Sequence, residues 1–179
     1  MMVMPYQPPF DAEKSLAATA YLAKQSGETI YTILKMIYLV DRAHLKRYGR
    51  PVTGDKFIAM KEGATPSRIY DSMKFLRGER KKRNWLPNAE KFLKVDPKTH
   101  DVSVVKMPGL DVLSASDMEC LDEVLAILQQ RKRWHIHELA HDAAWKATTR
   151  NSKMDIMTIA KSLGSAVAEH LADRFPGNA

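Results

Sequence analysis

The sequence predicts a mainly α-helical fold, a single compact domain over residues 1–179 with a small β-hairpin or short sheet inserted into it. Several long segments repeat apolar residues with a period near 3.6, and glycine or proline follows the end of most of them. Two short apolar segments, residues 92–95 and 102–105, flank a polar turn as in a hairpin. The 179 residues, 45% of them apolar, are enough to bury one core.

The N-terminal segment, residues 1–9, is predicted to be an extended arm because it contains three prolines. A first helix should follow, with Asp11 as its N-cap and Ser26 as its last residue. Gly27 suits the left-handed position that ends a helix. The inward face of this helix consists mostly of small residues, which indicates close packing against another helix.

A second helix is predicted from Thr29 to Tyr48, where apolar residues lie both on and off the main stripe. A helix that is apolar on most sides is buried on most sides, so this one should be central. Gly49 ends it and Pro51 prevents its resumption.

A further short strand is predicted over Lys56–Met60, followed by a third helix from Pro66 to Arg77. Thr65 suits the N-cap of this helix, and Pro66 suits its first position because proline has no N–H to satisfy there. Gly78 fits just beyond its end.

Three more helices complete the prediction. Ser116 and Glu119 form a capping-box pattern that opens the first of them. A second is expected over residues 137–148, and a C-terminal helix over residues 155–175.

Composition restricts the class of protein. The formal net charge of +7 favours acidic partners or nucleic acid. A single cysteine, Cys120, excludes an intrachain disulfide and fits a reducing compartment, and its helical setting favours a buried structural thiol. No run of about 18 apolar residues predicts a membrane span, and the N-terminus lacks the pattern of a secretory signal. We therefore expect a cytoplasmic protein.

Asp41 continues the apolar stripe of the second helix, where an unpaired carboxylate would cost several kcal/mol. The sequence offers Arg50, Thr53 and Arg68 as partners. The alternative is a general base, but no second acid–base group lies at a suggestive spacing.

The turn from Gly49 to Gly54 is a second candidate site, for phosphate. It lacks both the P-loop ending and the Rossmann glycine triplet. Two isolated glycines more often permit tight turns, so nucleotide binding is not favoured.

The segment from His137 to His141 satisfies the H-E-x-x-H pattern, in which two histidines hold zinc and the glutamate, here Glu138, activates water. Further potential ligands are His135, Glu169 and Asp173. This short pattern is also frequent by chance, so a zinc metallopeptidase stays an alternative, not the preferred interpretation.

A basic run over residues 77–83 is followed by Trp85. Such a cluster suits a solvated loop, an acidic protein surface or a nucleic acid. A second basic run, residues 131–133, either extends it or complements a helix C-terminus. From composition and expected exposure, we predict four partner-binding residues: Arg80, Arg83, Trp85 and Trp134.

Several turn and helix residues form a distinctive pattern in order along the chain; they are Asp41, Gly49, Arg50, Pro51, Thr53, Gly54, Asp55, Pro66, Tyr70, His141 and Trp145. The first half of this pattern is specific, and a Leu-x-x-x-His-x-x-x-Trp-like segment forms the weaker second half. With these residues, the sequence over residues 12–148 resembles the Panacea domain, also called the SocA-like antitoxin domain and found in phage-associated proteins. The sequence departs from the usual pattern at residues 63–66, which bears on partner preference.

The resemblance implies a non-enzymatic antitoxin of bacterial or prophage origin that neutralises a cognate toxin by direct protein–protein contact. Some members also deliver a toxin to a protease as an adaptor. It implies no catalytic residue, no metal and no cofactor, and it makes His137 and Glu138 incidental. A nucleic-acid-binding regulator is the main alternative, although no helix-turn-helix pattern is visible.

Overall fold

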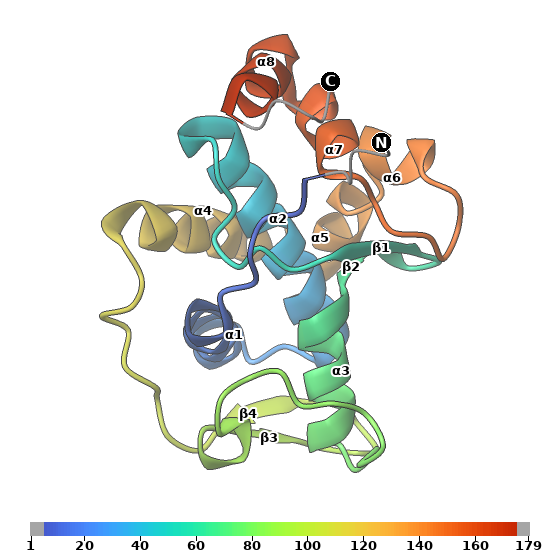
Figure 1. The fold of residues 1–179 in the computed structure, drawn as a ribbon. Helices are drawn as coiled ribbons and strands as arrows, with labels where there is room; N and C mark the ends of the chain where they lie inside the picture. Colours follow the sequence, from blue (N-terminus) through green and yellow to red (C-terminus); the bar gives the residue numbers. More distant parts are fainter. Residues whose placement is uncertain (1–5, 175–179) are drawn as a thin grey trace.

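Helix α2, Ile30–Tyr48, runs through the middle of the computed structural model, which describes residues 6–174 (Figure 1). Its contacts include α1, α3, α4, α5, α7 and strand β2. Of its 19 residues 13 are buried, which confirms the prediction of a central helix. The fold is mainly helical, as the sequence predicted.

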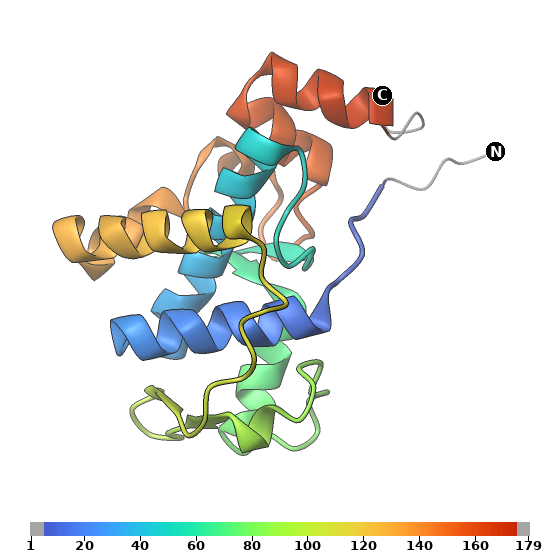
Figure 2. The same ribbon diagram turned by 90° about the vertical axis from the view of Figure 1, so that its left-hand side faces the viewer.

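Seven other α-helices and four short strands surround α2 in residues 6–174. The helices are α1 Ala12–Ser26, α3 Ser67–Leu76, α4 Ala115–Arg131, α5 Arg133–Leu139, α6 Ala143–Ala147, α7 Ile156–Leu163 and α8 Ser165–Arg174. The strands are β1 Phe57–Met60, β2 Gly63–Pro66, β3 Leu93–Val95 and β4 Val102–Val104, with a 3-10 turn at Ala89–Lys91. Figure 2 shows α1 and α4 side by side, with α2 crossing them.

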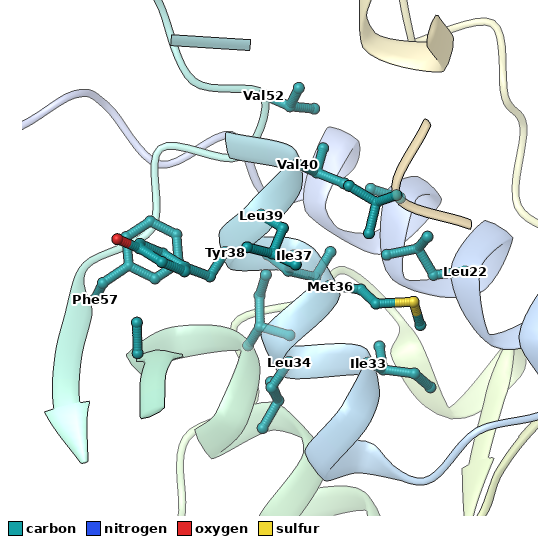
Figure 3. Close-up of a cluster of buried hydrophobic side chains, with 14 of the residues drawn as sticks. Leu22, Ile33, Leu34, Met36, Ile37, Tyr38, Leu39, Val40, Val52 and Phe57 are labelled. Carbon is teal, nitrogen blue, oxygen red and sulfur yellow. The ribbon is translucent and has the colours of Figure 1, made fainter. Parts of the chain in front are cut away.

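The core forms where the apolar faces of α2 meet its neighbours (Figure 3). Leu22 from α1 and Phe57 from β1 pack against it on different sides. Tyr38 is 1% exposed, and its ring meets that of Phe57 edge to face at 4.9 Å. Each such side chain contributes about 1.5–3 kcal/mol by burial, so α2 is fixed mainly by packing.

Helix α1 has the predicted ends. Asp11 accepts a hydrogen bond from the Lys14 N–H at 2.9 Å, and Gly27 ends the helix with φ of 65°. Its alanines from Ala17 onward are buried, which allows close approach to α2 and α4. Of the predicted extended arm, residues 6–9 have no regular secondary structure, and residues 1–5 lie outside the described part.

Both predicted strand regions are confirmed. Strand β3 pairs antiparallel with β4, and this hairpin lies next to α1 and α3 at the lower end of Figure 1. Strand β1 pairs antiparallel with β2, a strand that was not predicted from the sequence. Thr65 belongs to β2, so its predicted role as the N-cap of α3 is wrong, and α3 begins at Ser67 instead of Pro66. Pairing with β1 keeps residues 63–66 extended.

Three helix predictions need correction. Helix α4 begins two residues early, because Ser114 and Asp117 form its capping box in place of Ser116 and Glu119. The predicted helix over residues 137–148 is two helices, α5 and α6, because the Asp142 carboxylate caps a new helix by accepting from the Trp145 N–H at 2.9 Å.

The predicted C-terminal helix over residues 155–175 is also two helices, α7 and α8. Gly164, with φ of 135°, breaks the helical path between them. The predicted last residue of this helix, Phe175, lies outside the described residues. In the described chain, no helix is both long enough and apolar enough to cross a membrane.

Cys120 lies fully buried on α4, as predicted for a structural thiol. Burial raises the pKa of this thiol to about 11. The thiolate is therefore scarce at neutral pH, and the residue acts as a small apolar side chain.

Candidate functional site

Asp41 holds the glycine-rich turn against α2. Its Oδ1 accepts hydrogen bonds from the N–H groups of Val52 at 3.0 Å and Thr53 at 2.8 Å, and its Oδ2 accepts from the Thr53 hydroxyl at 2.6 Å. Of the three partners that the sequence offered, only Thr53 bonds to Asp41; Arg50 and Arg68 lie elsewhere. The carboxylate is 3% exposed and bonds mainly to backbone N–H groups, not to a cation.

Asp55 performs a similar task for α3. Its Oδ1 accepts from the Arg68 N–H at 3.1 Å, and its Oδ2 from the Ile69 N–H at 2.9 Å. These are free N–H groups of the first helical turn, so Asp55 caps α3 from 12 residues before its first residue, Ser67. It replaces the cap that the sequence assigned to Thr65.

The two turn glycines allow close contacts that a side chain would prevent. Gly54 has φ of 67°, and a Cβ there would lie 2.1 Å from the carbonyl oxygen of Pro9. Gly49 has φ of 71°, and a Cβ there would lie 2.4 Å from the ring of His170. Because the turn N–H groups of Val52 and Thr53 donate to Asp41, they are not free to cradle a phosphate.

Arg50 joins this turn to a second buried carboxylate, Asp117. The Asp117 side chain accepts from Arg50 at 3.1 Å, from Lys14 at 2.6 Å and from the Ser114 N–H at 2.9 Å. Burial raises the pKa of Asp117, but the hydrogen bonds from Lys14 and Ser114 outweigh it and hold the pKa below its usual value. Asp117 was not predicted as a site residue; its place three residues after Ser114 in a capping box was the available signal.

The second half of the family pattern lies at the β1–β2 hairpin. The Trp145 Nε1–H donates to the Met60 carbonyl at 2.8 Å, and the rings of His141 and Trp145 meet at 4.4 Å. The His141 ring nitrogens lie 2.7 Å from the His137 carbonyl oxygen and 3.1 Å from that of Lys61. His141 and Trp145 therefore tie α5 and α6 to the hairpin.

The H-E-x-x-H segment does not assemble a metal centre in residues 6–174, where no three histidine, cysteine or carboxylate side chains converge. His137 Nε2 lies 3.2 Å from the Thr32 hydroxyl, and burial lowers the pKa of this ring. Glu138 lies 3.1 Å from His135, and His141 is occupied by carbonyl groups.

Tyr70 lines a small cavity of about 110 Å³ together with Tyr31 and the buried Lys35. The Lys35 ammonium donates to the Thr65 hydroxyl at 2.5 Å and to the Gly63 carbonyl at 3.1 Å. Burial lowers the pKa of Lys35 to about 8, although Glu62 acts in the opposite direction. Lys35 was not predicted as a site residue, although its position among the apolar residues of α2 was a signal in the sequence.

The four candidate partner-binding residues fall into two separate places. Arg80, Arg83 and Trp85 lie in the loop after α3, whereas Trp134 lies on α5 at the edge of a cavity of about 630 Å³. Trp134 is 63% exposed, while Trp85 is half-buried. The structure thus brings three of them together and leaves the fourth apart.

A family model described as antitoxin SocA-like, Panacea domain, matches residues 33–146. The chain belongs to this family. No curated protein and no solved structure gives a significant match. The matched region begins in α2 and ends in α6, so it contains all the residues that carried the resemblance. Helices α1, α7 and α8 lie outside it.

Most of the residues that carry the resemblance thus form hydrogen bonds or ring contacts that build the scaffold. Asp41 fixes the turn, Asp55 caps α3, and His141 with Trp145 holds the hairpin. Pro66 ends β2 immediately before α3.

The two buried carboxylates predict a pH dependence of stability. Burial raises the pKa of Asp41 and of Asp55 to about 6, although hydrogen bonds from Thr53 and from α3 act in the opposite direction. Between pH 4 and 6 the folded protein then binds more protons than the unfolded chain, so the free energy of unfolding falls as pH rises. A shift of about two units corresponds to about 3 kcal/mol per group.

Asp41→Asn removes one of these titrations and keeps the shape of the side chain. Urea unfolding at several pH values should show a smaller decline between pH 4 and 6 in the variant, by about 3 kcal/mol. Equal declines in the two proteins would contradict the raised pKa of Asp41.

Proposed function

We propose that this chain is a non-enzymatic antitoxin that neutralises a cognate toxin by direct protein–protein contact. The observation that carries the proposal is membership of the antitoxin SocA-like family over residues 33–146. We place the interaction in the cytoplasm, because the free, buried thiol of Cys120 fits a reducing compartment.

The geometry supports a binding role over a catalytic one. A general base needs a free acceptor that faces its substrate. Asp41 instead accepts three hydrogen bonds from the turn, and the nitrogens of His141 face two carbonyl oxygens. These groups stabilise a rigid scaffold, which is what an inhibitor that covers a toxin surface requires.

Co-expression with the toxin tests the proposal. The candidate toxin is the product of the open reading frame beside this one, expressed alone and together with this chain. We expect growth arrest by the toxin alone, growth in the presence of this chain, and a complex of the two proteins on size-exclusion chromatography. Arrest that continues although the chain is soluble and folded would contradict the proposal.

A role as a protease adaptor would have a separate, measurable effect on the toxin level. If the chain delivers the toxin to a protease, the toxin should disappear quickly in cells that contain that protease and persist in cells that lack it. A toxin that stays at full level while growth is restored leaves direct inhibition as the mechanism and excludes the adaptor step.

A further inference from the structure

The loop after α3 contains cations of two kinds. Arg77 pairs with Glu79 at 2.5 Å, and Arg80 pairs with Glu90 at 2.6 Å. The other cations of the loop have no carboxylate within ion-pair distance among the described residues; they are Lys81, Lys82 and Arg83. All three are exposed. The local acidic side chains are thus already used, and an unbalanced positive surface remains.

Two arginines of this region, Arg68 and Arg83, lie over the ring of Trp85, whereas Arg80 lies over Phe75 at 4.4 Å. The guanidinium of Arg83 lies 3.8 Å from the ring centre of Trp85, and that of Arg68 lies 4.9 Å from it. Arg68 also lies 5.1 Å from the ring centre of Phe10, which meets Trp85 edge to face at 6.5 Å. The Trp85 N–H donates to the Ser72 hydroxyl at 2.8 Å, which fixes the loop to α3.

This stacking prepares the guanidinium groups for a ligand. A stacked guanidinium uses its flat face, while its N–H groups point outward in the plane. Neither Arg68 nor Arg83 forms a side-chain hydrogen bond with another described residue. Less conformational entropy is lost when a ligand binds to side chains that are already ordered.

The charged groups around Arg68 include two carboxylates, those of the buried Asp55 and of Asp155, and two further cations. Burial, and then the nearby charge of Lys56, lowers the pKa of the Lys153 ammonium; Asp155 opposes this and Arg68 adds to it. Lys56 and Lys153 thus extend the positive region beside Arg68. Repulsion between these cations would be relieved by an anionic ligand.

The N–H groups of a guanidinium fit carboxylate or phosphate oxygens. A single-stranded nucleic acid would also need open aromatic faces on which its bases could stack. Here two guanidinium groups already lie over the Trp85 ring, so that platform is occupied. The chemistry therefore favours the carboxylates of a protein.

We propose that Arg68, Lys81, Lys82, Arg83 and Trp85, hereafter the arginine–tryptophan surface, bind a carboxylate-rich segment of the partner protein. This inference rests on the proposed antitoxin function and assigns the contact to one surface. The surface includes Arg68, which was not predicted from the sequence as a contact residue, and it does not include Trp134. The paired Arg80 lies beside the surface and has its own acidic partner, Glu90.

Two double variants with equal charge loss test the surface. Arg68→Gln with Arg83→Gln removes the stacked guanidinium groups, whereas Arg80→Gln with Arg131→Gln removes two cations outside the surface. The probe is a fluorescent hexaglutamate peptide, measured by anisotropy at fixed ionic strength. We expect the first variant to bind it at least tenfold more weakly than the original protein, and the control to change by less than threefold.

Three outcomes would overturn the inference. Equal weakening in both double variants would show that only net charge matters. An unchanged affinity in the first variant would exclude the stacked arginines. Tighter binding of a duplex DNA oligonucleotide than of the peptide, lost in the first variant, would assign the surface to nucleic acid.

Arg83→Gln alone guards against a folding defect, because Arg83 is exposed whereas Arg68 is half-buried. This single variant should have the same thermal unfolding midpoint as the original protein and should still bind the peptide more weakly. Toxin co-expression separates the two proposals. If the Arg68→Gln, Arg83→Gln variant rescues growth fully, the surface is wrong and the antitoxin function stands. If the original protein fails to rescue, the antitoxin function falls, and the peptide measurement still decides what the surface binds.

Discussion

Replacing Asp41 with alanine is expected to lower the free energy of unfolding by about 3–5 kcal/mol at pH 7. The substitution removes the acceptor for two N–H groups and one hydroxyl, those of Val52 and Thr53, in a site that is 3% exposed. Each buried donor left without a partner costs about 1–3 kcal/mol. Urea unfolding followed by circular dichroism measures the loss.

Asp41→Asn is the matched control for this prediction. Asparagine keeps an oxygen that can accept from the turn and places its amide near the Thr53 hydroxyl, which can act as an acceptor. The loss should be less than half of that in the alanine variant. A loss below about 1 kcal/mol on Asp41→Ala would mean that the turn does not depend on this carboxylate.

Gly54→Ala should be the second most damaging of these changes, with a loss of about 2–3 kcal/mol. A left-handed conformation costs a residue with a Cβ about 1–2 kcal/mol. In addition, the new atom would lie 2.1 Å from the Pro9 carbonyl oxygen, so the N-terminal segment must move. That movement would disturb the hydrogen bond from the Asp11 N–H to the Thr53 carbonyl, which is 2.9 Å long.

Gly27→Ala provides the comparison, because Gly27 has nearly the same φ, 65°, and a Cβ there meets nothing within 4 Å. It should lose only the conformational part, about 1–2 kcal/mol. Thermal or urea unfolding of both variants gives the two losses. Equal losses would show that the contact between Gly54 and Pro9 contributes nothing to stability.

The helices that the sequence predicted well are those with strong local signals. Helix α2 shows a long apolar pattern ended by Gly49, and α1 lies between Asp11 and Gly27; both have the predicted ends within a residue. The β3–β4 hairpin could also be predicted, because two short apolar segments flank a polar turn. In these elements local preference and tertiary packing agree.

The features that could not be predicted depend on distant residues. Strand β2 is short and ends in proline, and it is extended because β1 pairs with it. The α3 cap comes from Asp55, which no local pattern connects to that helix. The break before α6 forms because the Asp142 side chain caps a new helix, which here is more stable than one continuous helix. The α-helical periodicity of the sequence does not distinguish these two arrangements.

The candidate site shows the same division. That Asp41 needed a partner followed from its place in an apolar stripe, and Thr53 was among the partners considered. The convergence of Lys14, Arg50 and Asp117 could not be foreseen, since these residues come from α1, the turn and α4. Likewise, the positions of Arg68 and Arg83 over Trp85 depend on how the loop folds back on α3.

The most direct test of the proposed function is a titration of the purified toxin with the purified chain, with residual toxin activity as the readout. An inhibitor that acts by covering the toxin should reduce this activity in proportion to the amount added, and inhibition should be complete near equimolar amounts. Complete inhibition by a small fraction of an equivalent would require turnover, and it would contradict a mechanism that depends on binding alone.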